Sequence, residues 1–569
     1  MSVLNSLLCL AAITHYAIDP MAETMYLPDA AGFADAREGE PVRAIAARGE
    51  YEPAGFLLRS DRGIAHVDFE IGELKTKDGK VFPKANIDLK TVKVWYQDMN
   101  AWYSYFADHG AKLCPELLLN DEDLVKVDEG KKCNYARLSR PDGKYDYFWL
   151  GYPEAFRQAF SDSTVGAQSR EELFSCMKPN FSDAANHKGA RLEKNRFKQF
   201  HLTYNVTKDV APGVYRGEVK VRGEGEEKKI PLVLRVLPFE LPRPGCYADP
   251  TKEFKTWFCD YTSIGNIMHV NGGDEKLAEK QLVAIAADFA RHGQYIPSFR
   301  EAFDRPDLVR AAGQDYSTDV MPTYSMQLVE PAEIRCHARA FRKLCDERFG
   351  KDSKPYIVWG DEYGLGILRG IRPMVDEYQN LGIRFPVNSH FGYAAGAHLT
   401  DIFWPPVRPE KTSNVFTGKY HDATGGRGYF GWYANLHVGA ENPAFNRRQY
   451  GMGPYRAGLS CNYNYAHHIQ GWSDSSQNLY RPMMFVYGCG SGCVDTLAWE
   501  GFREGLDDIR YATLLKTTAL KALDSPKRET RYTARLALKL LADADGDDMD
   551  LSALRLEMID FLLKLDAGK

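Results

Sequence analysis

An alternation of apolar and polar residues runs through much of the first 240 residues. Apolar side chains recur at every second position from about residue 41 to residue 236, most clearly in the segments 66–71, 200–206 and 230–236. A period of two is typical of half-buried antiparallel strands. Turn-forming residues separate these runs at 77–80, 212–213 and 223–229. The pattern predicts an N-terminal antiparallel β-sandwich of roughly 200 residues.

A proline-rich segment ends this pattern. Residues 237–245 read LPFELPRPG, with three prolines in nine residues. Proline cannot continue a hydrogen-bonded ladder, so the segment predicts a domain boundary. We therefore assign residues 31–240 to the sandwich domain and residues 1–30 to a signal or a disordered start.

The hydrophobic period changes to three or four residues after this boundary. The segments 274–291 and 333–348 predict amphipathic helices. Short apolar runs resembling strands lie between and after them, at 356–359, 384–387, 414–417 and 429–433. Strands alternating with helices over residues 245–498 favour a central (β/α)8-like barrel, with a doubly wound sheet as the alternative.

The remaining segment, residues 499–569, predicts only helices. It carries three apolar stripes at helical spacing, built on Leu514, Leu515 and Leu520, on Leu536, Leu540 and Leu541, and on Leu554, Met558, Phe561 and Leu562. The predicted fold class is therefore multidomain, with a β-sandwich, a (β/α)8-like barrel and C-terminal helices.

Charge and hydropathy exclude two classes of partner. The 569 residues contain 72 Lys and Arg against 77 Asp and Glu, so no basic surplus suits nucleic acid or an anionic membrane. No run of about 18 apolar residues is present, so we predict no membrane span. The aromatic residues, 12% of the chain, suit sugar faces as well as protein cores.

A short apolar stretch near the N-terminus bears on localisation. Leu7–Ile13 has the length of a signal-peptide core, but no Lys or Arg precedes it and the first is Arg37. We keep a periplasmic or secreted location and a cytoplasmic location as the two expectations.

Cysteine and glycine motifs indicate no cofactor. The 11 cysteines form no CxxC pair, and the closest two are Cys489 and Cys493, for which buried thiols are favoured over a disulfide or a metal pair. The loop Gly488–Gly492 lacks the Lys-Ser/Thr of a phosphate-binding loop. Neighbouring His467 and His468 have no carboxylate at ligand spacing, so we assign them a structural or sugar-contact role. We expect neither a metal nor an organic cofactor.

The segment 356–364, YIVWGDEYG, is the sharpest local feature. An apolar strand runs directly into Asp361 and Glu362, and in a barrel the residues after a strand lie at the active-site rim. Consecutive strand residues point to opposite faces, so these acids share a ligand only if the strand has ended. Gly360 and Gly364 permit that bend. The alternative is an exposed acidic turn or a helix N-terminus capped by Asp361.

Adjacent carboxyl groups suit glycoside cleavage. Two carboxyl groups this close cannot both ionise freely, so one is held toward its neutral form and can act as a general acid. The reaction requires a proton for the leaving oxygen and a stabiliser for the positive anomeric centre. For neighbouring acids, substrate assistance fits better than direct attack by the second carboxylate. We expect Glu362 to be the acid/base and Asp361 to polarise the 2-acetamido group of the sugar.

Three elements together carry a family resemblance. They are the Asp361–Glu362 pair after its strand, the turn Pro212–Gly217 (PGVYRG) and the segment Leu497–Tyr511 (LAWEGFREGLDDIRY). Together they resemble glycoside hydrolase family 123 and its wider, mostly uncharacterised relatives, over about residues 40–520. Family members of known activity are exo-acting β-N-acetylgalactosaminidases that use an adjacent Asp-Glu pair by substrate assistance. The resemblance implies Asp361 as the stabiliser and Glu362 as the acid.

Residues near the ends of the later strands could form a sugar-binding surface. Sugar recognition needs a ring under the apolar face of the sugar and polar groups around its hydroxyls. The candidates are Asn388, His390, Tyr393, Trp432, Tyr433, Tyr465, Trp472 and Asp474. Each aromatic has the alternative of a core position, and we favour Tyr433, Tyr465 and Trp472 as a set. The resemblance implies a strand-end tyrosine on the acetamido oxygen, for which Tyr433 is the candidate.

The charged residues of 500–510 predict an ion-paired helix start with an architectural role. The sequence as a whole predicts a retaining exo-glycoside hydrolase acting on a 2-acetamido sugar of an oligosaccharide or glycoconjugate, with β-linked N-acetylgalactosamine as the favoured sugar. The alternatives are the same architecture acting on another sugar and a non-catalytic carbohydrate-binding protein. The sequence predicts no oligomeric state.

Overall fold

The computed structural model describes most of the chain. The described residues are 13–98, 111–139, 143–150, 181–259, 263–270, 273–294, 305–314, 319–320, 333–357, 365–388, 402–404, 428–434, 443–465, 467, 472, 484–490, 492–544 and 549–567.

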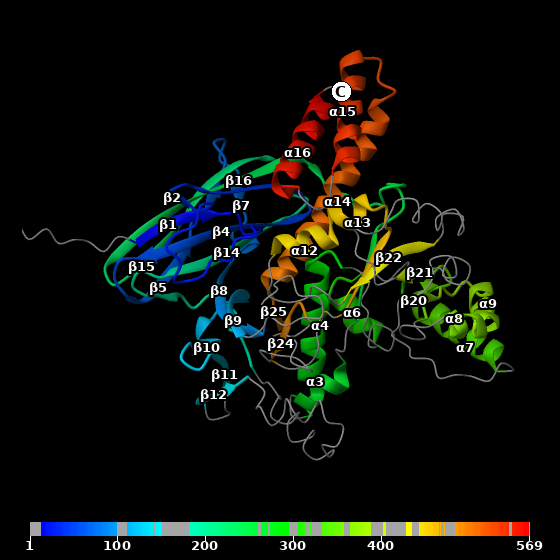
Figure 1. Ribbon diagram of the computed structural model, residues 1–569, viewed down its shortest axis with the longest axis horizontal. Helices are drawn as coiled ribbons and strands as arrows, with labels where there is room; N and C mark the ends of the chain where they lie inside the picture. Colours follow the sequence, from blue (N-terminus) through cyan, green and yellow to red (C-terminus); the bar gives the residue numbers. More distant parts are fainter. Residues whose placement is uncertain are drawn as a thin grey trace, which may run out of the picture.

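A β-sandwich forms the N-terminal domain, as predicted (Figure 1). One sheet has the order β2-β1-β4-β14-β8-β9, from Arg37–Glu38, Ile13–Ile18, Glu50–Ser60, Phe197–Val206, Ile87–Asp98 and Ala111–Leu119. The other has the order β13-β5-β15-β16-β3, from Ala190–Leu192, Ile64–Ile71, Gly213–Gly223, Glu226–Glu240 and Val42–Arg48, with β6 (Leu74–Lys75) and β7 (Val81–Phe82) attached to β15.

Apolar side chains of the two sheets meet between them. Phe56 of β4 stacks on Phe200 of β14 at 5.1 Å between ring centroids, and Phe69 of β5 approaches Phe200 at 4.8 Å. The alternation read from the sequence is therefore the alternation between this core and the outer faces. One pairing differs from the antiparallel expectation, because β3 runs parallel to β16.

Strand β1 corrects the assignment of the first 30 residues. Ile13–Ile18 pairs with β4 along its whole length, from Ile13 opposite Ser60 to Ile18 opposite Gly55. The sandwich therefore begins at least 18 residues before residue 31, since Ile13 is its first described strand residue. A short strand that continues an existing sheet edge carries little signal of its own, because the pairing partner is distant in sequence.

Shorter elements connect the sandwich to the rest of the chain. A three-stranded antiparallel sheet has the order β10-β11-β12, from Val125–Asp128, Cys133–Ser139 and Tyr145–Trp149. The single-turn helix η1 (Lys84–Asn86) lies between β7 and β8, and η2 (Glu122–Leu124) lies between β9 and β10. A hairpin of β24 (Tyr487–Cys489) and β25 (Gly492–Val494) occupies the glycine-rich loop.

The central region contains a parallel sheet. Its order is β17-β23-β22-β21-β20, from Lys255–Cys259, Cys461–Tyr465, Tyr429–Ala434, Ile402–Trp404 and Pro386–Asn388. Every neighbouring pair in this order is parallel. The first strand of the region lies beside the last, and the remaining strands follow in descending order. A separate parallel pair joins β18 (Asp319–Val320) to β19 (Lys354–Pro355).

Helices follow several of these strands. The predicted helices are confirmed as α4 (Glu275–Arg291), capped by the Asp274 carboxylate on the Leu277 amide, and α7 (Ile334–Phe349). The predicted strand at 414–417 lies outside the described residues. The other helices of the described part are α3 (Ile264–Val270), α6 (Pro306–Ala311), α8 (Leu365–Gly370), α9 (Arg372–Asn380), α12 (Pro443–Tyr450) and α13 (Met452–Arg456).

Three long helices end the chain, as the apolar stripes predict. They are α14 (Leu497–Ala522), α15 (Arg528–Asp543) and α16 (Leu551–Ala567), and α15 and α16 project together from one end of the molecule (Figure 1). The first turns of α14 are buried on every side, because the helix lies between the sandwich and the parallel-sheet region. No helix among the described residues has the length and apolarity needed to cross a membrane.

Two glycines of the motif allow α14 to approach its neighbours. A Cβ at Gly501 would overlap the carbonyl oxygen of Pro443, and a Cβ at Gly505 would lie 2.6 Å from that of Arg447. Both contacts are to the backbone of α12, which cannot move aside cheaply. The spacing of four residues places both glycines on one face of α14, so the motif encodes a close helix crossing.

Candidate active site

The carboxyl ends of the parallel strands define the candidate active site. Tyr356 bridges to Arg384 in parallel, and the Ile357 amide donates a hydrogen bond of 3.0 Å to the Arg384 carbonyl. The segment that leads to the two candidate acids therefore runs alongside the segment that enters β20, in the same direction. Asp361 and Glu362 themselves lie outside the described residues, four and five positions after Ile357.

Aromatic packing fixes the direction of this segment. The Trp257 ring of β17 meets the rings of Tyr356 and Tyr429 edge-on, at 5.7 Å and 5.9 Å. The Arg384 guanidinium lies over both tyrosine rings and donates a 2.5 Å hydrogen bond to the Tyr356 hydroxyl. Burial raises the pKa of Tyr356, so the hydroxyl stays protonated at neutral pH. These contacts bind the segment before Asp361 to the first and later strands of the sheet.

Several predicted sugar contacts lie at strand ends. Asn388 and Tyr465 are the last residues of β20 and β23, and Tyr433 is the last but one of β22. Their backbones therefore reach the carboxyl edge of the sheet, as predicted, while their side chains are not among the described groups. His390, Tyr393 and Asp474 lie outside the described residues, as does His468.

Two predicted aromatics are buried. Trp432 is 1% exposed and packs against Tyr450 of α12 at 5.7 Å. Trp472 is 3% exposed, lies 6.3 Å from Trp95, and donates its indole N–H to the Gly488 carbonyl at 2.6 Å. In this structure neither ring offers an open face to a sugar, and both occupy core positions.

A buried charged junction lies where the sandwich, α4 and α14 meet. The Glu500 carboxylate of α14 lies 3.0 Å from His201 of β14 and 3.2 Å from His292 at the end of α4, and it forms an ion pair with Arg503. His292 lies 3.2 Å from Asp288 through its other ring nitrogen. The predicted ion-paired helix start is therefore confirmed, and it extends across three elements.

The environment sets the charges of this junction. Burial opposes ionisation of Asp288 and Glu500, but the cations around them outweigh it and hold the pKa of each well below its ordinary value. Burial also opposes the charged form of His292, yet Asp288 and Glu500 raise its pKa to about 9. At neutral pH the junction thus contains an imidazolium between two carboxylates.

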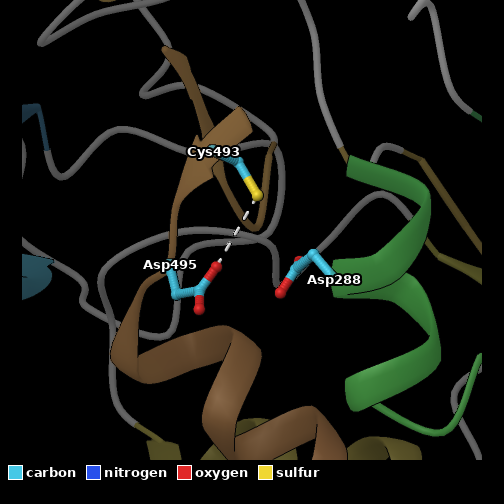
Figure 2. A group of neighbouring side chains, drawn as sticks. All are labelled: Asp288, Cys493 and Asp495. Atoms are coloured by element: carbon cyan, nitrogen blue, oxygen red, sulfur yellow. Dashed lines mark hydrogen bonds between the residues drawn. The ribbon is translucent and has the colours of Figure 1, made fainter. Parts of the chain in front are cut away.

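Asp495 and Cys493 lie beside the junction (Figure 2). The Cys493 thiol donates to the Asp495 carboxylate at 3.7 Å, and Asp288 completes a set of groups close enough to hold a cation. The Asp288 oxygens already accept 2.9 Å hydrogen bonds from Arg291 and from Trp499. Burial and the charge of Asp288 raise the pKa of Asp495 to about 6. A cation would therefore compete with existing donors. Cys489 and Cys493 are free thiols, as expected.

A second buried ionic cluster joins α12, α14, α16 and the sandwich. Arg447 of α12 forms a two-pronged contact with Asp508, at 2.7 Å and 2.9 Å. Arg555 of α16 bonds to Asp508 at 2.7 Å and to Glu504 at 2.5 Å, and it lies 3.4 Å from Glu52 of β4. These partners are far apart in the sequence, so the spacing of charged residues within the motif 497–511 did not predict them.

The junction and the cluster predict a stability that falls as pH rises. Burial and the charge of Asp507 raise the pKa of Glu50 in β4 from 4.5 to about 8, and the pKa of His292 is raised from 6.5 to about 9. The folded state then holds protons that the unfolded chain has released. The Glu50 contribution declines between pH 4.5 and 8, and the His292 contribution declines between pH 6.5 and 9. Burial lowers the pKa of Lys255 from 10.5 to about 7, which acts in the opposite direction above pH 7, so the urea midpoint is expected to fall most clearly between pH 5 and 7.

The Glu50→Gln variant isolates one of these groups. An amide does not titrate, so the variant is expected to show a flatter pH profile below pH 8, with the His292 decline kept. A Glu50→Gln profile that runs parallel to the wild-type profile between pH 5 and 7 would contradict the Glu50 assignment.

Comparison with solved structures identifies the fold. The chain is similar to a family 123 glycoside hydrolase from Clostridium perfringens, whose structure was described in connection with glycolipid glycan hydrolysis. The TM-score is 0.60 at 11% identity, and the match covers 92% of this chain and 93% of that chain. The two chains therefore share an overall fold, which agrees with the resemblance seen in the sequence.

Other comparisons are weaker. A β-galactosidase from Bacteroides fragilis, itself a provisional assignment, matches at 8% identity and TM-score 0.29 over 81% of this chain and 60% of that chain. A sugar phosphate isomerase/epimerase from Parabacteroides distasonis matches at 10% identity and TM-score 0.25 over 46% and 94%. Scores this low reflect partial overlap of elements. No family model and no curated protein sequence matches the chain.

Proposed function

We propose that this protein is a retaining exo-glycoside hydrolase that acts on a terminal 2-acetamido sugar, with β-linked N-acetylgalactosamine as the favoured substrate. The observation that carries the proposal is the fold match over 92% of the chain to a family 123 glycoside hydrolase. The adjacent acids Asp361 and Glu362 support it, because they follow a segment that enters the parallel sheet beside β20.

The proposal includes a closed (β/α)8-like barrel. In an open doubly wound sheet the first and last strands are usually not neighbours, whereas closure of a barrel brings them side by side. Strand β17 lies next to β23, and β22, β21 and β20 follow in descending order. The Tyr356 bridge and the β18-β19 pair continue the same order. This arrangement supports a barrel with Asp361 and Glu362 at its carboxyl-terminal rim.

The proposed mechanism assigns one task to each acid. Glu362 delivers a proton to the leaving oxygen and later removes one from the attacking water. Asp361 accepts a hydrogen bond from the N–H of the acetamido group, so that the acetamido oxygen attacks the anomeric carbon. Tyr433 is the proposed donor to that oxygen, and Tyr465 with Asn388 is proposed to contact the sugar. No step requires a metal or an organic cofactor.

A panel of aryl glycosides tests the reaction class. We expect release of the aryl group from the β-N-acetylgalactosaminide, and inhibition by the thiazoline analogue of N-acetylgalactosamine at concentrations at least about a hundredfold below the substrate KM, as for a transition-state analogue. Turnover of other glycosides without thiazoline inhibition would assign another sugar and remove substrate assistance. Glycan binding without product release would instead identify a non-catalytic carbohydrate-binding protein.

A further inference from the structure

A cavity of about 330 Å³ lies at the meeting point of the sandwich, the proline-rich segment, α4 and α14. No described residue of the strands of the parallel sheet lines it, and the motif 497–511 supplies one of its walls. Its lining includes Gly49, Tyr51 of β4, residues 240–244, the end of α4 and one face of α14. The proposed hydrolase reaction uses none of these residues.

The lining is rich in cations. Lys208, Arg243, Arg291, Arg503 and Arg510 line the cavity, against the acids Glu240 and Asp507. His292, whose pKa is raised to about 9, adds a sixth cation. The carboxylates of Asp288 and Glu500 lie behind Arg291 and Arg503 rather than in the lining. The surface that a ligand meets is therefore positive, although acids farther back moderate the field.

Two buried polar atoms of α14 in this wall have no hydrogen-bond partner among the described residues. The Nε–H of Arg503, a residue only 4% exposed, has no acceptor, while the same guanidinium pairs with Glu500 and stacks over Tyr51. The Oδ2 atom of Asp507 has no donor, and its other oxygen accepts a 2.6 Å hydrogen bond from Arg510. A buried polar group without a partner destabilises the folded protein. A ligand that offers an acceptor to Arg503 and a donor to Asp507 would therefore gain binding free energy from both contacts.

We propose that this cavity binds a small oxyanion that also carries a hydroxyl group. The anionic oxygens would accept from Arg503 and its neighbouring cations, since arginine can only donate. The hydroxyl would donate to Asp507, since an ionised carboxylate can only accept. Residues 503 and 507 are one turn apart on α14 and therefore share a face, so one compact ligand can reach both. Hydrogen phosphate and a sugar acid are two ligands that combine anionic oxygens with a hydroxyl group.

The Asp507 carboxylate predicts that the cavity binds phosphate more tightly than sulfate. Phosphate keeps at least one proton at neutral pH, whereas sulfate has none. Sulfate would place an acceptor against the Asp507 carboxylate, and two acceptors without a proton between them repel. Isothermal titration calorimetry of the full-length protein with inorganic phosphate is expected to show one site, with sulfate binding at least about tenfold more weakly.

Two variants and one control test the assignment. Asp507→Asn introduces an N–H donor and is expected to reduce the preference for phosphate over sulfate to less than about threefold. Arg291→Gln is expected to weaken phosphate binding at least about fivefold. It also removes a donor to the buried Asp288 carboxylate, so a lower melting temperature is expected and binding is measured well below it. Lys539→Gln, at an exposed ion pair of α15 far from the cavity, is expected to leave binding unchanged.

A titration with glucuronate, which is a sugar acid, distinguishes the two candidate ligands, phosphate and a sugar acid. Binding tighter than that of phosphate identifies a sugar acid as the preferred ligand, and weaker binding identifies phosphate. The proposal is overturned if neither anion binds below about 10 mM, where a built site of this kind should be occupied. Equal affinities for phosphate and sulfate, or equal effects of Arg291→Gln and Lys539→Gln, would also overturn it.

Discussion

The Glu362→Gln variant is expected to lose at least about a thousandfold in kcat on a glycoside with a poor leaving group. Glutamine keeps the shape of the side chain but cannot deliver a proton, and general acid catalysis contributes about 10² to 10⁴ in rate. The loss should shrink on an aryl glycoside whose leaving group departs without a proton. Steady-state kinetics on both substrate types measure this difference directly.

Two companion variants make the result interpretable. Asp361→Asn is expected to lose most activity on both substrate types, because the polarised acetamido group is needed whatever the leaving group is. Glu347→Gln, at an exposed position of α7, is the matched control for removal of one carboxylate and should retain wild-type kinetics. Full activity in either of the first two variants would remove the proposed mechanism while leaving the fold assignment intact.

Replacement of Arg555 by methionine is expected to lower the free energy of unfolding by about 3–5 kcal/mol. The Arg555 guanidinium is buried and contacts Glu504 and Asp508 of α14. Its removal leaves these carboxylates beside Glu52 and takes away a cation that contacts both of them, while Arg447 still pairs with Asp508. An uncompensated buried charge costs far more than a lost surface pair, and methionine fills much of the volume without supplying a donor. Urea denaturation at neutral pH measures the change.

The control for this variant is an exposed cation on the same helix. Lys564 pairs with Asp560 one turn away, and both side chains are more than half exposed. Lys564→Met is expected to change the unfolding free energy by less than about 0.5 kcal/mol. Equal effects of the two substitutions would show that the Arg555 cluster contributes no more than a surface ion pair, which contradicts the role derived from its burial.

Local pattern predicted much of the architecture. The period of two from residue 41 to residue 236 gave the sandwich, and the helical periods at 274–291 and 333–348 gave α4 and α7. These signals are strong because each element buries one face along its own length. The pairing of β1 with β4 was missed, since a short added strand depends on a partner some forty residues away.

The sequence predicted one part of the candidate site and not the other. The sequence placed Asn388, Tyr433 and Tyr465 at strand ends, which depends only on where each strand stops. It did not distinguish them from Trp432 and Trp472, which are buried against Tyr450 and Trp95. An aromatic ring at a strand end looks the same in sequence whether a helix or a solvent-filled space covers it.

The sequence by itself determined most of the sandwich strands, the helices α4 and α7 and the three C-terminal helices, as well as the adjacent acids Asp361 and Glu362. Only the tertiary structure decided which charges meet: Glu500 lies against His201 and His292, and Arg555 lies against Glu52 and Asp508. The reason is physical. Hydrophobic period acts between near neighbours along one element, whereas a buried charge is stabilised by whichever opposite charge the packing of distant elements brings within hydrogen-bond reach.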